Sequence, residues 1–232
     1  MVRAARRAMR DGPLGLLMLD TTFERFPGDI GHPATWPGPV LSERIEGATA
    51  ARVTTLADES LLAPFLAGAR RLEARGASII TTSCGFLVLY QSALADAVSV
   101  PVATSALVQV PWLARLLRRP VGVLTFDPTT LGPAHLAAAG ADAATPVGGL
   151  SPDSLMRRDI LGGAPANFAT REAEVVAAAR ALAAAHPSLG ALVLECTNFP
   201  PHAAAIATAT GLPVYDVVTL VRWMQAGHAP SA

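Results

Sequence analysis

The chain has 232 residues, of which 51% are hydrophobic and only 5% aromatic, and its acidic and basic side chains balance to zero net charge. This length can bury a good core as one large domain or two small ones. The sequence has no basic excess for nucleic acid or an acidic membrane face, and no run of roughly 18 apolar residues that would form a membrane helix. We therefore expect a cytoplasmic protein that acts on a small-molecule substrate, without a nucleic-acid or membrane partner.

All 18 basic residues are arginines. A chain without lysine cannot form a lysine Schiff base, hold pyridoxal phosphate as an internal aldimine, or use a P-loop lysine. The histidines show no metal-ligand spacing with any cysteine or acid, so we expect no metal and no cofactor. Two cysteines in a cytoplasmic protein are more typical of reduced thiols than of a disulfide.

The apolar run 15–20 predicts a buried strand. The following stretch, 21–39, is rich in proline and glycine and fits neither a helix nor a central strand. A long loop directly after the first strand is a candidate substrate lid, and an ordinary surface loop is the alternative. Phe26, His32 and Trp36 are costly to expose, and Phe26 and Trp36 are candidates for closing over the substrate.

Strands and helices alternate along the rest of the chain, which predicts an α/β fold with parallel sheets flanked by helices and right-handed crossovers. We expect two similar lobes related by a pseudo-twofold axis, the first formed by 14–105 with 215–226 and the second by 106–214. The glycine pairs at 148–149 and 162–163 bracket a candidate mobile loop. The predicted strands are 77–83, 100–104, 121–126, 191–195 and 213–217, and the predicted helices are 60–75, 86–97, 130–139, 172–185, 203–210 and 218–225.

The two cysteines of the chain occupy equivalent places in a repeated pattern. Each follows a buried strand, and Pro101 follows Cys84 by 17 positions just as Pro213 follows Cys196 by 17 positions. In open parallel sheets, ligands bind beyond the carboxyl ends of the strands. We therefore expect one active site in the cleft between the lobes, with a thiol on either side.

Two identical groups on opposite sides of a substrate suit the removal of a proton from one face of a carbon and its delivery to the other. A helix start after each cysteine predicts a thiol pKa lowered toward neutrality. The carbanion between the two steps needs hydrogen-bond donors at its oxygens. The alternative to a binding role is a turn cap for Asp20 and a solvated residue at a helix start for His202. The candidate substrate-binding residues are Asp20, Thr21, Thr82, Ser83, Gly85, Phe86, Thr125, Thr129, Thr197, Asn198 and His202.

Two motifs resemble those of the aspartate/glutamate/hydantoin racemase superfamily of cofactor-independent two-cysteine racemases. Leu194-Glu-Cys-Thr-Asn198, followed by Gly211-Leu-Pro-Val-Tyr-Asp216, is similar to its second-cysteine motif and departs at Glu195, where the family usually has glycine. The segment 122–129 is similar to the family strand that ends in a threonine-containing turn. The resemblance implies the two-lobed fold, independence of cofactors and a catalytic role for Cys84 and Cys196.

The first-cysteine motif indicates the substrate class. Amino-acid racemases of the superfamily read Cys-Asn-Thr there, whereas this chain reads Cys84-Gly85-Phe86, which is more similar to hydantoin racemases and arylmalonate decarboxylases. Free aspartate or glutamate is therefore not the expected substrate. We expect an isomerase, a racemase or epimerase of a small carboxylate or amide-type substrate. A decarboxylase, a cis–trans isomerase or a non-catalytic ligand-binding relative are the alternatives, and a homodimer or higher homo-oligomer stays open.

Overall fold

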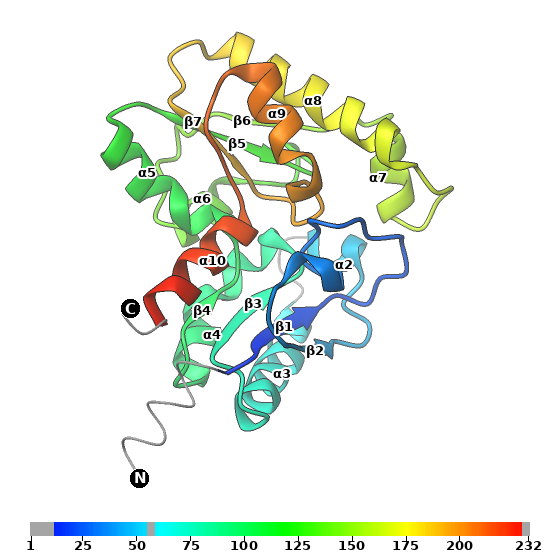
Figure 1. Ribbon diagram of the computed structural model, residues 1–232, viewed down its shortest axis with the longest axis vertical. Helices are drawn as coiled ribbons and strands as arrows, with labels where there is room; N and C mark the ends of the chain where they lie inside the picture. Colours follow the sequence, from blue (N-terminus) through cyan, green and yellow to red (C-terminus); the bar gives the residue numbers. More distant parts are fainter. Residues whose placement is uncertain (1–11, 55–58, 229–232) are drawn as a thin grey trace.

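The computed structural model describes residues 12–54 and 59–228 as two lobes, each built on a four-stranded parallel sheet (Figure 1). The first sheet has the order β2-β1-β3-β4 and the second the order β6-β5-β7-β8, so the two lobes share one topology. The predicted α/β fold with two similar parallel-sheet lobes is confirmed. The first sheet contains β1 (Leu14–Met18), β2 (Val40–Arg44), β3 (Ile79–Thr82) and β4 (Val102–Ala103); the second contains β5 (Val121–Thr125), β6 (Val147–Gly149), β7 (Ala191–Leu194) and β8 (Val214–Tyr215).

The central strands β1, β3, β5 and β7 are buried except at Met18, which explains their largely apolar sequences. In register, Leu14 pairs with Ile79 in the first sheet and Val121 with Ala191 in the second. Parallel strands covered by helices on both faces read as apolar runs without alternation. One apolar cluster contains residues of both lobes, among them Ile79, Val123 and Val193, and therefore joins them.

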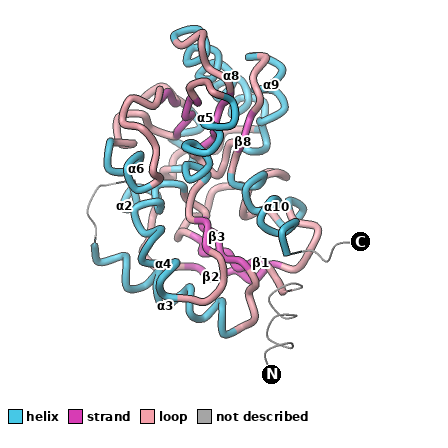
Figure 2. The backbone as a smooth tube through the Cα atoms, turned by 90° about the vertical axis from the view of Figure 1, so that its left-hand side faces the viewer, coloured by secondary structure: helices cyan, strands magenta, loops and turns pink. Residues whose placement is uncertain are grey.

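Helices cover the sheets and connect their strands. In the first lobe these are α2 (Ala50–Thr54), α3 (Leu62–Ala74) and α4 (Gln91–Ala97), and α5 (Val110–Leu117) leads into the second. The second lobe has α6 (Pro133–Ala138), α7 (Leu155–Ile160), α8 (Phe168–Ala185) and α9 (Ala203–Thr210). The last helix, α10 (Val217–His228), contacts β3 and lies at the junction of the lobes in both views (Figures 1 and 2).

Short 3-10 helices replace or extend several predicted elements. They are η1 (Pro33–Thr35), η2 (Glu59–Leu61), η3 (Gly85–Tyr90), η4 (Ala106–Gln109) and η5 (Pro200–His202). The predicted helix 86–97 is η3 followed by α4, so the chain after Cys84 enters a 3-10 turn rather than an α-helix. No helix in the described part of the chain has the length and apolar content needed to cross a bilayer.

The segment 148–163 is not the predicted loop. Its first glycines belong to β6, and α7 follows with Met156 and Ile160 buried. A Cβ on Gly149 would lie 2.5 Å from the Thr125 carbonyl oxygen, so glycine is needed there for the edge strand to approach β5. Gly148 and Gly149 thus serve strand packing, whereas the N–H groups of Gly162 and Gly163 bond to carbonyls at the end of α7. The segment is part of the second lobe.

Candidate active site

Both thiols line one cleft between the lobes, at the carboxyl ends of the strands. Both cysteines are free; Cys84 is partly exposed and Cys196 is buried. The cleft thus brings together the two halves of the repeated pattern. Eight of the thirteen predicted site residues line it: Thr21, Ser83, Cys84, Gly85, Phe86, Cys196, Thr197 and Asn198.

The same backbone arrangement presents each thiol. The residue before each cysteine extends the strand pairing by one bond, from Ser83 N–H to the Leu17 carbonyl (2.9 Å) and from Glu195 N–H to the Leu124 carbonyl (2.8 Å). The backbone N–H two residues after each cysteine, on Phe86 and on Asn198, is hydrogen-bonded to the sulfur. The sulfurs therefore leave their strands at equivalent points and meet equivalent donors.

The predicted lowering of the thiol pKa values is wrong. Burial raises the pKa of Cys84 to about 12 and the pKa of Cys196 well above its ordinary value, and the Glu195 carboxylate is the second cause in both cases. The backbone N–H donors lower both pKa values, but by less. Apolar walls and a buried acid disfavour a second negative charge more strongly than these donors stabilise it. Both thiols are therefore protonated in the empty cleft at neutral pH.

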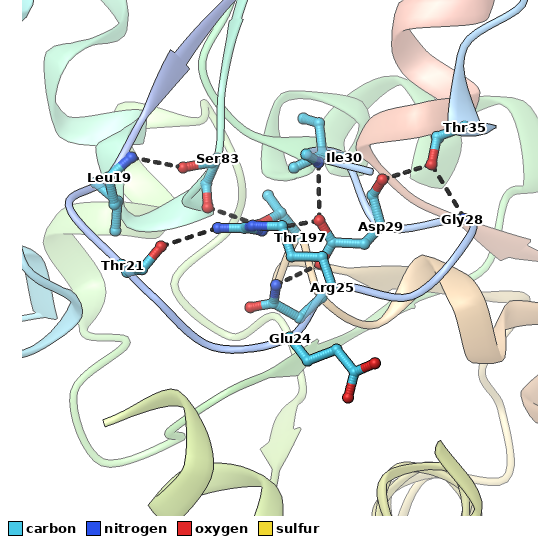
Figure 3. Close-up of polar contacts among 12 residues, drawn as sticks. Leu19, Thr21, Glu24, Arg25, Gly28, Asp29, Ile30, Thr35, Ser83 and Thr197 are labelled. Atoms are coloured by element: carbon cyan, nitrogen blue, oxygen red, sulfur yellow. Dashed lines mark hydrogen bonds and ion pairs between the residues drawn. The ribbon is translucent and has the colours of Figure 1, made fainter. Parts of the chain in front are cut away.

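Opposite charges distinguish the two thiols. Arg25 lowers the pKa of Cys84, whereas Asp29 contributes to raising the pKa of Cys196. The Cys196 thiol donates to Asn198 Oδ1 (3.7 Å), and Asn198 Nδ2 donates to Asp29, which orients the amide. Figure 3 shows Arg25 between its partners Thr21 (3.1 Å) and Asp29 (2.8 Å). The surroundings thus favour a thiolate at Cys84 over one at Cys196.

Glu195 is a buried acid in the cleft wall. Its Oε2 accepts a hydrogen bond from Thr125 Oγ1 (2.6 Å), while Oε1 has no hydrogen-bond partner among the described residues. The Phe126 N–H also stabilises the carboxylate and lowers its pKa. Burial raises the pKa of Glu195 to about 7. A Cβ on Gly85 would lie 2.4 Å from both Oε1 and the carbonyl oxygen of Glu195. Gly85 therefore leaves room for Oε1 at the residue that follows Cys84.

A second contact joins the two cysteine turns. The buried Thr197 hydroxyl donates to the Ser83 carbonyl oxygen (2.7 Å), and the Ser83 hydroxyl accepts from the Leu19 N–H (2.8 Å; Figure 3). The first of these bonds links the two turns across the cleft, and the second holds Ser83 within its own lobe.

The family model described as Asp/Glu/Hydantoin racemase matches residues 32–224. The chain belongs to this family. It is 28% identical to a dimethylsulfoniopropionate lyase of Durusdinium sp. clade D over 229 residues, which cover 90% of this chain and 73% of that protein. It is 30% identical to dimethylsulfoniopropionate lyase 5 of Emiliania huxleyi over 228 residues, which cover 90% of this chain and 44% of that protein.

Solved structures confirm the racemase-family fold. A mutant of arylmalonate decarboxylase matches with a TM-score of 0.64 at 18% identity, covering 93% of this chain and 92% of that one. Allantoin racemase from Klebsiella pneumoniae matches with a TM-score of 0.58 at 15% identity, covering 93% and 87%. The predicted superfamily is therefore confirmed. The curated relatives are lyases and not isomerases, so enzymatic activity is supported while the predicted isomerase stays a prediction.

Five of the predicted binding residues do not line the cleft. Asp20 forms an ion pair with Arg44 and accepts from the Gly47 N–H (3.0 Å), which is the turn-cap alternative. His202 is buried outside the cleft against Phe168, with ring centroids 4.6 Å apart, and is not a solvated residue. The other three are threonines that use their own hydroxyl groups in hydrogen bonds within the fold. Thr82 donates to the Thr104 carbonyl, Thr129 donates to Asp127, and Thr125 donates to Glu195.

The loop after β1 enters the cleft with residues other than the predicted ones. Phe23 and Arg25 line the cleft. Phe26 instead packs on Phe168 of α8 (5.4 Å between ring centroids), and Trp36 is buried in the core, with its ring N–H donating to Ile30 (2.8 Å). The predicted closure by Phe26 and Trp36 is therefore wrong, because both rings are used for packing.

Ile160 and Glu195 also line the cleft, although neither was predicted as a site residue. The departure from the family glycine at position 195 was the signal that pointed to Glu195. For Ile160 there was none, since α7 was not predicted. In the described residues, no group of three or more histidine, cysteine and acidic side chains is placed to hold a metal ion.

Proposed function

We propose that the protein is a cofactor-independent enzyme that removes the proton from the carbon next to a carboxylate, with Cys84 as the base and Cys196 on the opposite side of that carbon. The observation that carries this proposal is the presence of two free thiols, from equivalent turns, in one cleft. Thiols can act as acid or base when their charge is controlled by the site. The Arg25 side chain favours the thiolate at Cys84.

We propose elimination of a β-substituent as the overall reaction, which makes the enzyme a lyase. In dimethylsulfoniopropionate, the base takes the proton next to the carboxylate, and the electron pair of that C–H bond forms the new C=C bond. The C–S bond breaks with both electrons going to sulfur, so neutral dimethyl sulfide leaves and acrylate remains. The support is the identity of 28–30% to proteins named dimethylsulfoniopropionate lyase along 90% of this chain.

The lining of the cleft agrees with such a substrate. Phe23, Phe86 and Phe126 contribute aromatic rings to a mainly apolar wall. A methylated sulfonium has no N–H or O–H donor, so it needs no acceptor side chains, and aromatic faces attract cations. The ammonium group of a free amino acid would instead need several acceptors. The wall therefore favours a sulfonium over aspartate or glutamate, in line with the sequence-based expectation.

Racemisation or epimerisation of a small carboxylate or amide is the second candidate. The observation that favours it is the equivalent placement of the two thiols, because one can deliver a proton to the face opposite the one that lost it. The first step is the same in both reactions. They differ in whether the carbanion expels a β-substituent or is protonated again.

One assay separates these reactions. The purified protein is incubated in D₂O with dimethylsulfoniopropionate, or with chiral carboxylates and hydantoins. Headspace gas chromatography detects dimethyl sulfide, NMR detects acrylate and α-deuterium, and carbon dioxide release reports decarboxylation. We expect dimethyl sulfide and acrylate in equal amounts, and neither from the Cys84→Ala/Cys196→Ala double variant. Deuterium incorporation without elimination would make the enzyme a racemase, and no product from any compound would contradict the proposal.

A further inference from the structure

Glu195 is a buried acid with one carboxyl oxygen hydrogen-bonded to the fold and the other without a partner among the described residues. Only 1% of the residue is exposed, and its Oε2 accepts a hydrogen bond from Thr125 Oγ1. Its Oε1 lies against Gly85 in the cleft wall, without a hydrogen-bond partner among the described residues. A buried oxygen left unpaired costs free energy, so its retention points to a use in the site.

The protonation states of the two thiols and of Glu195 suggest a role for this oxygen in proton transfer. Both thiols are protonated when the cleft is empty, yet the proposed reaction needs one thiolate. Deprotonation to bulk water would add a second negative charge to a site that already contains the Glu195 carboxylate. Transfer of the proton to that carboxylate moves the charge without adding one, which avoids most of the electrostatic cost.

We propose that Glu195 Oε1 accepts the proton of Cys84 when substrate binds, and so generates the thiolate that attacks the substrate C–H bond. This inference rests on the proposed function. In the step, the S–H bond of Cys84 breaks, an O–H bond forms on Glu195, and the negative charge passes from oxygen to sulfur. Glu195 acts through the thiol and is a proton-relay residue, and it releases its proton to solvent when the product leaves.

The charged groups around Glu195 are consistent with this step. From the loop after β1, Arg25 and Asp29 form an ion pair (2.8 Å), and Arg25 lies close enough to Cys84 to lower its pKa. From the second lobe, Asp127 pairs with Arg157, whose guanidinium lies 5.6 Å from the centre of the Phe126 ring. Because these four charges balance as two pairs, the Glu195 carboxylate and the thiols decide the charge of the cleft.

The first experiment compares Glu195→Gln with Glu46→Gln, which changes an exposed glutamate outside the cleft. Glutamine has the shape of glutamate and can accept from Thr125, but it cannot take a proton. We expect kcat for dimethylsulfoniopropionate to fall at least about 100-fold in Glu195→Gln, with KM changed by less than about threefold. The wild-type activity should fall below about pH 7, where Glu195 is protonated, and this acid limb should be absent from the variant.

A second measurement does not depend on turnover. We expect iodoacetamide to alkylate Cys84 faster in Glu195→Gln than in the wild type at pH 8, by at least about threefold, because the neighbouring negative charge is gone. Peptide mass spectrometry assigns the modified cysteine. Faster alkylation together with slower turnover is the expected result, and loss of packing alone would not produce this pair of opposite changes together with loss of the acid limb.

The variant Thr125→Val tests the same group if Glu195→Gln does not fold. Removal of the Thr125 hydroxyl takes a donor from the carboxylate and raises the pKa of Glu195, so the acid limb should move to higher pH. Unchanged kcat and an unchanged acid limb in Glu195→Gln would overturn the proposal. If no substrate is turned over, the alkylation data still decide: logarithmic rates that rise with unit slope from pH 6 to 8.5 in both wild type and Glu195→Gln would overturn it, whereas a reduced slope near pH 7 in the wild type alone would support it.

Discussion

The two cysteine turns have the same backbone and different side chains. In each lobe the residue before the cysteine binds the N–H of the residue that follows the lobe's first strand. Ser83 binds the Leu19 N–H with a neutral hydroxyl, and Glu195 binds the Phe126 N–H with a carboxyl group. The two equivalent positions thus carry a neutral serine in the first lobe and an acid in the second. The carboxyl group of the cleft wall therefore comes from the second lobe alone.

The residues that follow the cysteines complement this difference across the cleft. Thr197 donates to the Ser83 carbonyl (2.7 Å), whereas Gly85 leaves room for Glu195. Gly85 of the first turn therefore lies against Glu195 of the second, and Thr197 of the second turn lies against Ser83 of the first. A repeated scaffold can therefore be symmetric in its backbone while its proton-transfer chemistry is directional.

The largest expected effect distinguishes the two thiols. We expect Cys84→Ala to lower kcat/KM by about 10³-fold or more, since no other group replaces the base. Cys196→Ala should lose about tenfold to 100-fold, because it removes one hydrogen-bond donor to the developing charge. Steady-state kinetics of both single variants and the double variant measure this, with thermal melting as the control for folding. Equal losses in both single variants would favour a racemase with interchangeable thiols, and a larger loss in Cys196→Ala would exchange the assigned roles.

The acid at position 195 should also be visible in stability. The folded-state pKa of Glu195 is raised, from an ordinary value of 4.5 to about 7, so its contribution to stability is fully present below pH 4.5 and is lost as pH rises through 7. We expect the free energy of unfolding of the wild type, relative to that of Glu195→Gln, to fall by about 3 kcal/mol across this window. Urea unfolding at several pH values measures it. Ser83→Ala, at the equivalent neutral position, should stay parallel to the wild type; a wild type parallel to Glu195→Gln would contradict the prediction.

The complementary glycine can be tested by filling its space. In Gly85→Ala the new Cβ would lie 2.4 Å from the Glu195 carbonyl oxygen, and this backbone atom must shift. We expect the free energy of unfolding to fall by about 1–3 kcal/mol, the usual cost of overpacking, and turnover to fall with the displaced carboxyl group. Chemical denaturation and kinetics measure both. Gly38→Ala, where nothing lies within 4 Å of the added atom, is the matched control. An unaffected Gly85→Ala would show that the two turns are not packed against each other.

The repeat and the strand ends could be predicted from sequence because each leaves a local signal. Buried parallel strands are continuous apolar runs, and the equal spacing from Cys84 to Pro101 and from Cys196 to Pro213 reflects the shared topology. The order of elements then placed both cysteines at strand ends. The short edge strands β2 and β6 were missed because they carry polar residues or glycine and have no apolar run.

The charges of the site could not be predicted in the same way. The thiol pKa values depend on burial and on a carboxylate from the opposite turn, and neither is a local property of the residues around Cys84. The ends of helices suggested lowered values, but burial dominates. Likewise, Phe23 and Arg25 enter the cleft while Phe26 packs on Phe168, and this ring contact joins residues far apart in the chain.

The smallest expected effect concerns the bond that joins the two turns. In Thr197→Val the side chain keeps its shape, but the Ser83 carbonyl loses the buried donor that lies 2.7 Å away. Removal of one partner of a buried hydrogen bond costs about 1–3 kcal/mol, and a neutral pair lies toward the lower end. We expect a loss of about 1 kcal/mol in the free energy of unfolding and less than tenfold in turnover, because no charge of the cleft changes. Thr208→Val is the control, since its exposed hydroxyl donates only to the Ala204 carbonyl within α9. If Thr197→Val were as stable as this control, the turns would be held by packing alone; a loss of turnover as large as that of Glu195→Gln would mean that the spacing of the turns matters as much as the placement of the charge.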